Sequence, residues 1–209
     1  MNIFKRILCV AGVALSVTFA HAEIVDPSLA PDQLVEAVSN NVINEIRKDP
    51  ELAKAEPSHV RELVDKHILP YTDFARMTKM AVGPAWRKAT EEQRTEIQNL
   101  FRQLLVGVYS GALKEASDYK VVLRPNKVKP GERQTIICSQ LVSQGREPIV
   151  LDYRVLDSGK GWKIFDVNVG GVWLVENYRS QFSSVISSSG LEGLITQLKD
   201  RVSNLKSGK

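Results

Sequence analysis

The spacing of apolar residues changes twice along the chain, and this change limits the possible folds most strongly. Over residues 31–117 the apolar residues recur every three or four positions, which is typical of amphipathic helices. Over residues 119–170 they alternate with polar residues, as in strands, and the helical spacing returns over residues 174–206. Helices and strands that occur in separate runs favour an α+β fold.

The strongest helical signal begins at Thr90. Thr90 and Gln93 fit a capping box, in which each side chain binds a free backbone N–H of the other residue. The apolar stripe that follows runs to about Ala116, which predicts a helix roughly 40 Å long. We expect this helix to cover one face of the sheet. The stripe consists of Ile97, Leu100, Phe101, Leu104, Leu105, Val108 and Leu113.

The strand region contains turn signals that divide it into about four strands. The segment 157–161 combines Asp, Ser and Gly between two alternating runs, and it predicts a hairpin loop. The strands follow each other too closely for crossover helices, so the sheet is predicted to be antiparallel. In the last strand, strict alternation places Phe165, Val167 and Val169 on one face.

The first 22 residues have the features of a secretory signal peptide. Lys5 and Arg6 precede an uncharged apolar run, and the segment 20–22, Ala-His-Ala, offers a cleavage site. A retained membrane anchor is the alternative, although the apolar run is short for a membrane span. We therefore predict an exported mature chain over residues 23–209, folded as a single domain.

The composition of the mature chain excludes several classes of protein. Removal of Lys5 and Arg6 lowers the formal net charge from +4 to +2, and no basic run is interleaved with aromatic residues. No nucleic-acid partner is therefore expected. Cys138 is the one cysteine of the mature chain, so it makes no intrachain disulfide. We interpret it as a small apolar residue in a strand.

The sequence contains little that could perform catalysis. It lacks the glycine-rich nucleotide-binding loops and the Gly-x-Ser-x-Gly motif, and His59 and His67 are not spaced as a helical metal-binding pair. No metal or cofactor is expected. Asp152 and Asp166 lie within strands, where ion pairs with Arg154 or Lys163 are the usual role. The alternative is an enzyme in which Asp152 or Asp166 is a general base at the mouth of an apolar cup.

Several segments closely resemble those of the MlaC family, also called the toluene-tolerance family. The resemblance covers most of the mature chain, in the same order, and Trp173 departs from it where we expect a small residue. The C-terminal segments are Trp-Lys-Ile-Phe-Asp-Val at 162–167, Val-Gly-Gly-Val at 169–172 and Asn-Tyr-Arg-Ser-Gln-Phe at 177–182. The helical segments are Ile-Leu-Pro at 68–70, Asp-Phe at 73–74, Met77, Val-Gly at 82–83 and Trp-Arg-Lys-Ala-Thr at 86–90.

The resemblance implies a fold and a function. The implied fold is a curved antiparallel sheet packed against helices, with the N- and C-terminal helices enclosing an apolar pocket. The implied function is a periplasmic carrier that binds a phospholipid as its cargo and maintains outer-membrane lipid asymmetry, without covalent chemistry. The implied partners are an inner-membrane ABC transporter with an MCE-type protein and an outer-membrane lipoprotein–porin complex.

The apolar faces of the long helix and the sheet suggest which residues would bind the lipid. Arg87 and Arg179 are candidates for the phosphate, with a structural ion pair as the alternative. A periplasmic adaptor that binds only proteins is a rival function. The predicted acyl-chain contacts are Leu104, Val108, Val121, Ile136, Leu151, Tyr153, Phe165, Val167 and Val169, with Phe74, Met77, Trp86, Tyr178 and Phe182 near the opening.

Overall fold

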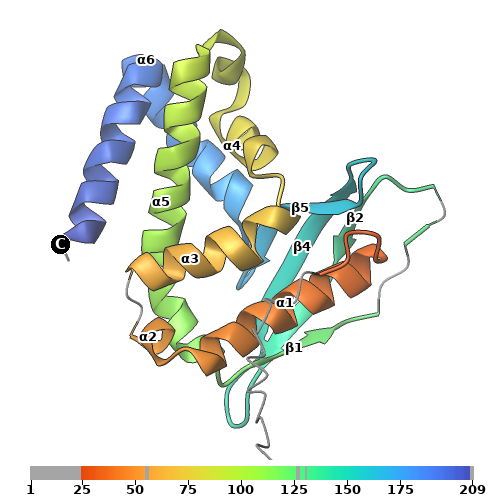
Figure 1. Cartoon of the computed structure of the whole chain (residues 1–209). Coiled ribbons are helices and arrows are strands. Elements are labelled where there is room, and N and C mark those ends of the chain that lie inside the picture. The colour runs from red at the N-terminus through yellow and green to blue at the C-terminus, as the bar shows by residue number, and fades with distance from the viewer. Residues whose placement is uncertain (1–24, 55–56, 126–127, 130, 208–209) are drawn as a thin grey trace, which may run out of the picture.

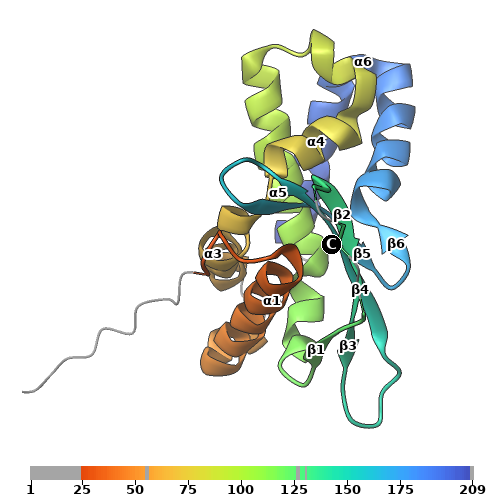
Figure 2. The ribbon, with the colours of Figure 1, turned by 90° about the vertical axis from the view of Figure 1, so that its right-hand side faces the viewer.

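The computed structural model describes residues 25–54, 57–125, 128–129 and 131–207. The predicted signal peptide over residues 1–22 lies outside them. A group of long helices stands beside a twisted sheet, and the first helix lies across one face of that sheet (Figures 1 and 2). The fold is therefore α+β, as predicted. No helix in these ranges is both long and apolar enough to span a membrane.

The helices occur where the apolar spacing predicts them. The capping box of the long helix is confirmed, because the Thr90 N–H donates to Gln93 Oε1 at 3.0 Å and the Gln93 N–H donates to Thr90 Oγ1 at 3.2 Å. The helices are α1 (Pro31–Lys48), α2 (Pro50–Ala53), α3 (Pro57–His67), α4 (Phe74–Val82), α5 (Glu91–Ala116) and α6 (Leu174–Lys206), with two 3-10 helices, η1 (Leu69–Tyr71) and η2 (Gly83–Lys88).

Helix α6 changes direction at Gly190. This glycine has φ 68° and ψ −169°, which is a conformation that residues with a Cβ rarely adopt. The two halves of α6 therefore pack side by side as two helices. Both halves flank α5 (Figure 1).

The sheet is antiparallel and open, with the strand order β1-β3-β4-β5-β6 and β2 paired to β4. It has more strands than the four predicted, because the chain leaves the ladder at Cys138 and so divides one expected strand into β2 and β3. A tight turn at Gly170 and Gly171 adds the short β6. The strands are β1 (Lys120–Leu123), β2 (Gln134–Ile137), β3 (Ser139–Val142), β4 (Ile149–Asp157), β5 (Trp162–Val169) and β6 (Val172–Trp173).

A bulge in β5 corrects the predicted faces of that strand. Arg154 pairs with Asp166 but Val155 pairs with Ile164, so Phe165 has no partner of its own. The bulge turns Phe165 to the outer side of the sheet, where it packs with Met77 of α4, while Val167 stays on the face that packs against α1. The prediction that Phe165 and Val167 share a face is wrong.

The predicted partner of the sheet is also wrong. Helix α1, not α5, covers the inner face, where Val35 packs with Tyr153 and other sheet residues. Helix α5 instead packs against α6, α4 and α3. The wide apolar stripe of α5 therefore serves a helical core, in which Phe101 is fully buried against the rings of Tyr178 and Phe182.

The helical core gives a prediction about stability. Replacing Phe101 with Ala leaves a cavity among aromatic rings, and we expect the free energy of unfolding to fall by about 3–5 kcal/mol. Urea denaturation of the purified variant measures this change. Val122→Ala is the control, because Val122 is 41% exposed on the sheet and its truncation should cost far less. Equal unfolding midpoints for the two variants would contradict the central role of Phe101.

Candidate functional site

The inner face of the sheet carries the largest set of aligned apolar residues. The register pairs Val121 with Leu141, Leu141 with Ile149, and Leu151 with Val169, so these side chains share one face. Leu141, Ile149 and Val169 are only half-buried and lie in none of the buried clusters. The part of this face beyond α1 thus remains accessible.

A buried hydrogen bond joins α1 to the inner face of the sheet. The hydroxyl groups of Ser39 on α1 and Tyr153 on β4 are 2.9 Å apart. Burial raises the pKa of Tyr153 to about 12, so its hydroxyl remains protonated at neutral pH. This bond ties the middle of α1 to the centre of the sheet.

The structure does not bring the predicted lipid contacts together in one place. Met77 and Phe165 lie on the outer side of the sheet, and Val108 and Ile136 are more than 40% exposed. The inner-face premise is therefore wrong for Ile136, whose neighbour Ile137 faces α1 instead. The inner sheet face holds Val121, Leu151, Tyr153, Val167 and Val169; the helical core holds Phe74, Trp86, Leu104, Tyr178 and Phe182.

The members of the second group are mostly closed off by the protein itself. Leu104 and Phe182 are at most 1% exposed, and Tyr178 is 3% exposed. Sequence reasoning also missed Leu141 and Ile149, which share the inner face. Leu141 is followed by Val142 and Ile149 by Val150, so alternation with polar residues does not single them out, and their position beyond α1 depends on the strand register.

Three surface hollows lie along the helices. One follows the outer side of α5, a second lies between η1 and α5 beside Phe74 and Arg102, and a third of about 500 Å³ lies at the turn of α6 beside η2. None of these three is lined by the sheet. The expected pocket between the sheet and the helices stays a prediction.

Asp152 has a structural environment on the outer face of the sheet. Its Oδ1 accepts hydrogen bonds from Arg124 Nη2 at 2.8 Å and from the Ser139 N–H at 3.0 Å. Asn168 Nδ2 approaches Oδ2 of the same carboxylate at 3.5 Å. The predicted ion pair is therefore present, but its partner is Arg124 rather than Arg154 or Lys163.

Asp166 is fully buried and joins three elements. Its carboxylate accepts hydrogen bonds from the N–H groups of Val167 at 2.9 Å and Val175 at 3.0 Å, and it pairs with Arg154 at 2.8 Å. Burial raises the pKa of Asp166, and these three contacts oppose the rise. Because Val175 is the second residue of α6, Asp166 caps this helix from a strand.

Arg154 adds further contacts between the sheet and the start of α6. It also donates to Glu176 of α6 at 2.8 Å, and its guanidinium lies 4.0 Å from the ring centre of Trp173. Trp173, where we expected a small residue, therefore packs on a cation at the start of α6. With their oxygen atoms engaged in these contacts, Asp152 and Asp166 do not support the alternative in which either is a general base.

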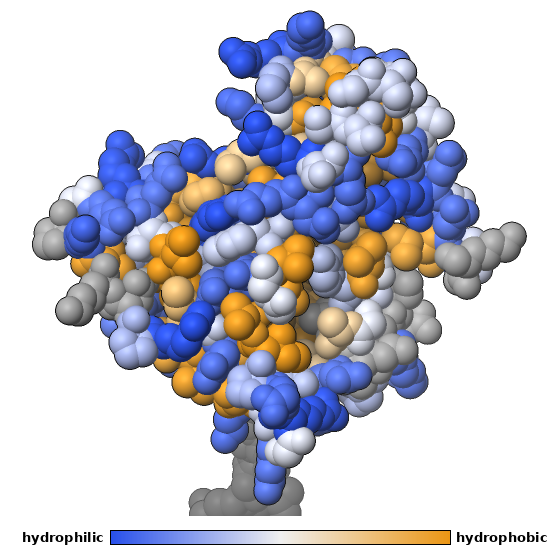
Figure 3. Space-filling model, turned by 180° about the vertical axis from the view of Figure 1, so that it is seen from behind, coloured by the Kyte–Doolittle hydropathy of each residue, from blue (hydrophilic) through white to orange (hydrophobic). Residues whose placement is uncertain are grey.

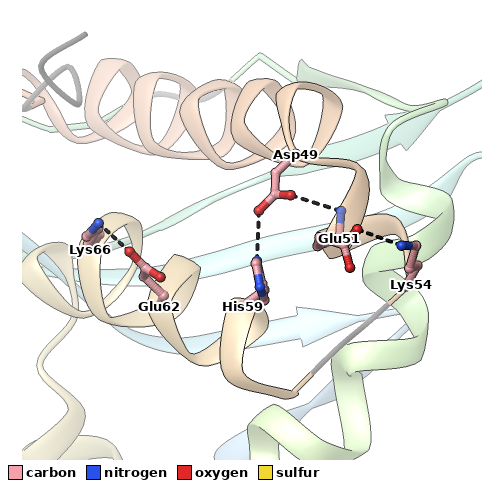
Figure 4. Close-up of polar contacts among 6 residues, drawn as sticks. All are labelled: Asp49, Glu51, Lys54, His59, Glu62 and Lys66. Carbon is pink, nitrogen blue, oxygen red and sulfur yellow. Dashed lines mark hydrogen bonds and ion pairs between the residues drawn. The ribbon is translucent and has the colours of Figure 1, made fainter. Parts of the chain in front are cut away.

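The remaining candidate groups do not form a metal centre. His59 Nδ1 lies 3.1 Å from Asp49 Oδ2, and Asp49 Oδ1 accepts from the Glu51 N–H at the start of α2 (Figure 4). This contact ties α3 to the end of α1. In the described ranges, no three His, Cys, Asp or Glu side chains are grouped so that they could hold a metal ion.

The two predicted phosphate ligands are both exposed. Arg87 lies on η2, and Arg179 on α6 approaches Gly83 at the end of α4. Neither makes an ion pair with any residue of the described chain, so the structural ion pair is wrong for both.

Comparison with known proteins identifies the family. The family model described as MlaC protein matches residues 36–200. The chain belongs to the MlaC family. Two curated members are similar: the intermembrane phospholipid transport system binding protein MlaC of Haemophilus influenzae, 22% identical over 83% of each chain, and the toluene tolerance protein ttg2D of Pseudomonas putida, 24% identical over 77% of this chain and 74% of that protein.

A solved protein of similar fold has a bound ligand. The phospholipid-binding protein of Ralstonia solanacearum, solved in complex with a phospholipid, is 38% identical to this MlaC-family chain. The TM-score is 0.80, and the match covers 82% of this chain and 96% of that one. The predicted family and fold class are confirmed, and these relatives are named as binding and transport proteins rather than enzymes.

The contacts of Asp166 with Arg154 and α6 lead to a prediction about stability. Asp166→Ala leaves Arg154 and two backbone N–H groups without their acceptor, and we expect a loss of about 3–5 kcal/mol in the free energy of unfolding. Asp166→Asn keeps one acceptor oxygen and should lose less. Chemical denaturation of both variants measures the difference. If Asp166→Ala is as stable as the natural protein, the carboxylate does not hold α6 on the sheet.

Proposed function

We propose that this chain is a periplasmic phospholipid carrier that takes lipid between the inner and the outer membrane and so maintains outer-membrane lipid asymmetry. The observation that carries the proposal is the similarity to the Ralstonia protein, which is covered almost completely and was solved with a phospholipid. The predicted signal peptide over residues 1–22 is consistent with export.

The physical task explains why such a carrier is needed. A phospholipid with two chains of about 16 carbons loses roughly 0.8 kcal/mol for each CH₂ exposed to water, or about 20 kcal/mol in total. Crossing an aqueous gap unaided is therefore very slow. A carrier must offer the chains an apolar surface that is nearly as favourable as the bilayer.

The inner face of the sheet is the surface that fits this task best. Beyond the cover of α1 it presents Leu141, Ile149 and Val169, and it continues through Leu151 and Val167, which pack only partly against the core. We propose that the acyl chains lie on this face, between the sheet and the C-terminal half of α5. The predicted contacts Val121, Leu151, Tyr153, Val167 and Val169 belong to it.

The helical core plays a different part in this proposal. Leu104, Tyr178 and Phe182 pack against other side chains, so they would touch lipid only if the helices moved apart. We assign them to the support of the site rather than to its lining. No cofactor or covalent step is required, because carriage needs only binding and release.

The partners follow from the family and from the need for release. We propose an inner-membrane ABC transporter with an MCE-type protein at one end of the route and an outer-membrane lipoprotein–porin complex at the other. A partner must change the site or its opening, because a carrier that only binds does not deliver.

Native mass spectrometry of the purified mature chain tests the proposal. We expect a lipid-sized mass on the natural protein, and organic extraction should yield phospholipid. Val167→Trp fills the inner face, so it should lose the lipid and keep the far-ultraviolet circular dichroism of the natural protein.

The matched control is Val122→Trp, which places the same side chain on the opposite face of the sheet. It should retain the lipid, because Val122 pairs with Gln140 on the outer side. A natural protein that carries no lipid in either measurement would contradict the carrier function. Normal loading of Val167→Trp would contradict the assignment of the acyl chains to the inner face.

A further inference from the structure

Two breaks in the helices meet at one end of the helical layer. The 3-10 helix η2 joins α4 to α5 there, and Gly190 divides α6 beside it (Figures 1 and 2). A hollow of about 500 Å³ lies between the two breaks, at the opposite end of the molecule from α1 and β1 (Figure 1). Its lining includes Pro84, Ala85 and Lys88 of η2 and Ile186, Leu191 and Glu192 of α6.

Hydrogen bonds hold both sides of this hollow in place. On the side of η2, the ring of Trp86 is buried in the helical core, and its carbonyl oxygen accepts hydrogen bonds from Arg94 Nε at 3.3 Å and Nη2 at 3.2 Å. On the side of α6, Gln93 Nε2 donates to Glu192 Oε1 at 2.6 Å. Because the hollow is already formed in the chain alone, a ligand would bind there without a large cost in ordering the protein.

The floor of the hollow is apolar. Ala85, Ile186 and Leu191 are half-buried and pack against the helical core. Figure 3, seen from behind, shows apolar residues among hydrophilic ones at this end of the molecule. The large apolar side chains that are exposed in the described part of the chain all lie elsewhere. This end therefore offers a concave apolar surface that could receive a side chain, and no protruding one that could enter a membrane.

Four exposed cations lie around the hollow, and none of them has a partner within the chain. No hydrogen bond or ion pair joins any of the four side chains to another residue of the described ranges. Like charges that are close together repel each other, so such a group favours a ligand of opposite charge. The four are Lys79 in the last turn of α4, Arg87 and Lys88 on η2, and Arg179 on α6.

Two observations place Arg179 beside the hollow although it lies on another helix. A Cβ added to Gly83, the residue before Pro84, would lie 3.8 Å from Arg179 Nε. Arg179 also precedes Ile186 by about two helical turns, so the two side chains share one face of α6. Among the lining residues, Glu192 is the one carboxylate, and it lies on the second half of α6. The side formed by η2 and the first half of α6 is therefore positive.

We propose that the hollow and these four cations are a docking site for an acidic segment of a partner protein, which inserts one apolar side chain between η2 and the break in α6. Carboxylates of the partner would pair with Arg87, Lys88 and Arg179, while the apolar side chain is buried on Ile186 and Leu191. Arginine beside a preformed apolar pocket is typical of the residues that dominate protein interfaces. The contact is small, so binding should be weak and transient.

The proposed site is separate from the surface that we assign to the acyl chains. A partner bound at this end leaves the accessible part of the inner sheet face uncovered, because β1 and β3 lie at the other end of the molecule (Figure 2). The docking inference therefore does not rest on the carrier function, and each can fail without the other.

A synthetic peptide with the sequence Glu-Asp-Glu-Leu-Phe-Glu-Asp-Glu is the probe, titrated into the isotopically labelled mature chain and followed by nuclear magnetic resonance. The amide shifts that change should belong to residues 79–93 and 179–192. The double variant Arg87→Glu/Arg179→Glu should weaken binding about tenfold, because it replaces two attractions with repulsions. Ala85→Leu narrows the hollow without changing the charge, and it should weaken binding about fivefold.

The matched control is Arg61→Glu/Lys120→Glu, which reverses two exposed charges on α3 and β1. It should bind the peptide as the natural chain does. Equal affinity of Arg87→Glu/Arg179→Glu and the natural chain, or shift changes at other residues, would overturn the proposal. Thermal unfolding of each variant shows whether it is folded, and the charge reversals at exposed positions should leave the melting temperature unchanged within a few degrees.

Two further probes separate the other possible occupants of the site. A peptide with Ala in place of Leu and Phe should bind more weakly, and equal binding would show that charge alone acts and that nothing enters the hollow. Vesicles of phosphatidylglycerol and phosphatidylethanolamine test a membrane surface by co-sedimentation. Co-sedimentation of the natural chain that Arg87→Glu/Arg179→Glu abolishes, without peptide binding, would assign the cations to a membrane and overturn the proposal. Bound lipid should be retained in all these variants, whichever result the peptide gives.

Discussion

A buried carboxylate in β5 determines how the two halves of the molecule meet. Asp166 caps the start of α6, accepts a hydrogen bond from the Val167 N–H beside the bulge at Phe165, and neutralises Arg154 of the neighbouring strand. Helix α6 in turn packs along α5 and α4, so the point at which it leaves the sheet sets the position of the whole helical layer. A second tie lies nearby, where the Asp73 N–H donates to the Ile164 carbonyl oxygen at 2.7 Å. Both ties lie on β5.

This arrangement divides the apolar side chains between two separate cores. The helical core around Phe101 shares no residue with the core that α1 forms on the sheet. The helical core is closed, and solvent does not reach several of its side chains. The core between α1 and the sheet is continuous with half-buried residues beyond α1. The open apolar surface is therefore a property of the sheet, and the helices determine what stands opposite it.

The sequence predicted the elements better than their partners. Local rules act within a few residues, so the capping box at Thr90 and the hairpin loop after Asp157 could both be predicted from the sequence. The bulge at Phe165 was not, because its residues also fit strict alternation and only the register with Arg154 reveals the extra one. The sequence also could not predict that α1 rather than α5 covers the sheet, because both helices carry an apolar stripe. The predicted placement of the lipid contacts on shared faces was wrong where it relied on these two points.

The separation of the cores bears on how a lipid could be released. A protein whose only core is its cargo site would lose stability as the cargo leaves, at roughly 0.8 kcal/mol for each CH₂ no longer buried. Here the rings of Phe101, Tyr178 and Phe182 are packed by protein alone, so the helical layer keeps its stability without cargo. In the proposed site, the cost of release falls on the inner face of the sheet, and a partner needs only to cover that face or to offer the lipid an equally apolar surface. A rigid helical layer held to the sheet at β5 thus allows the site to empty without unfolding the carrier.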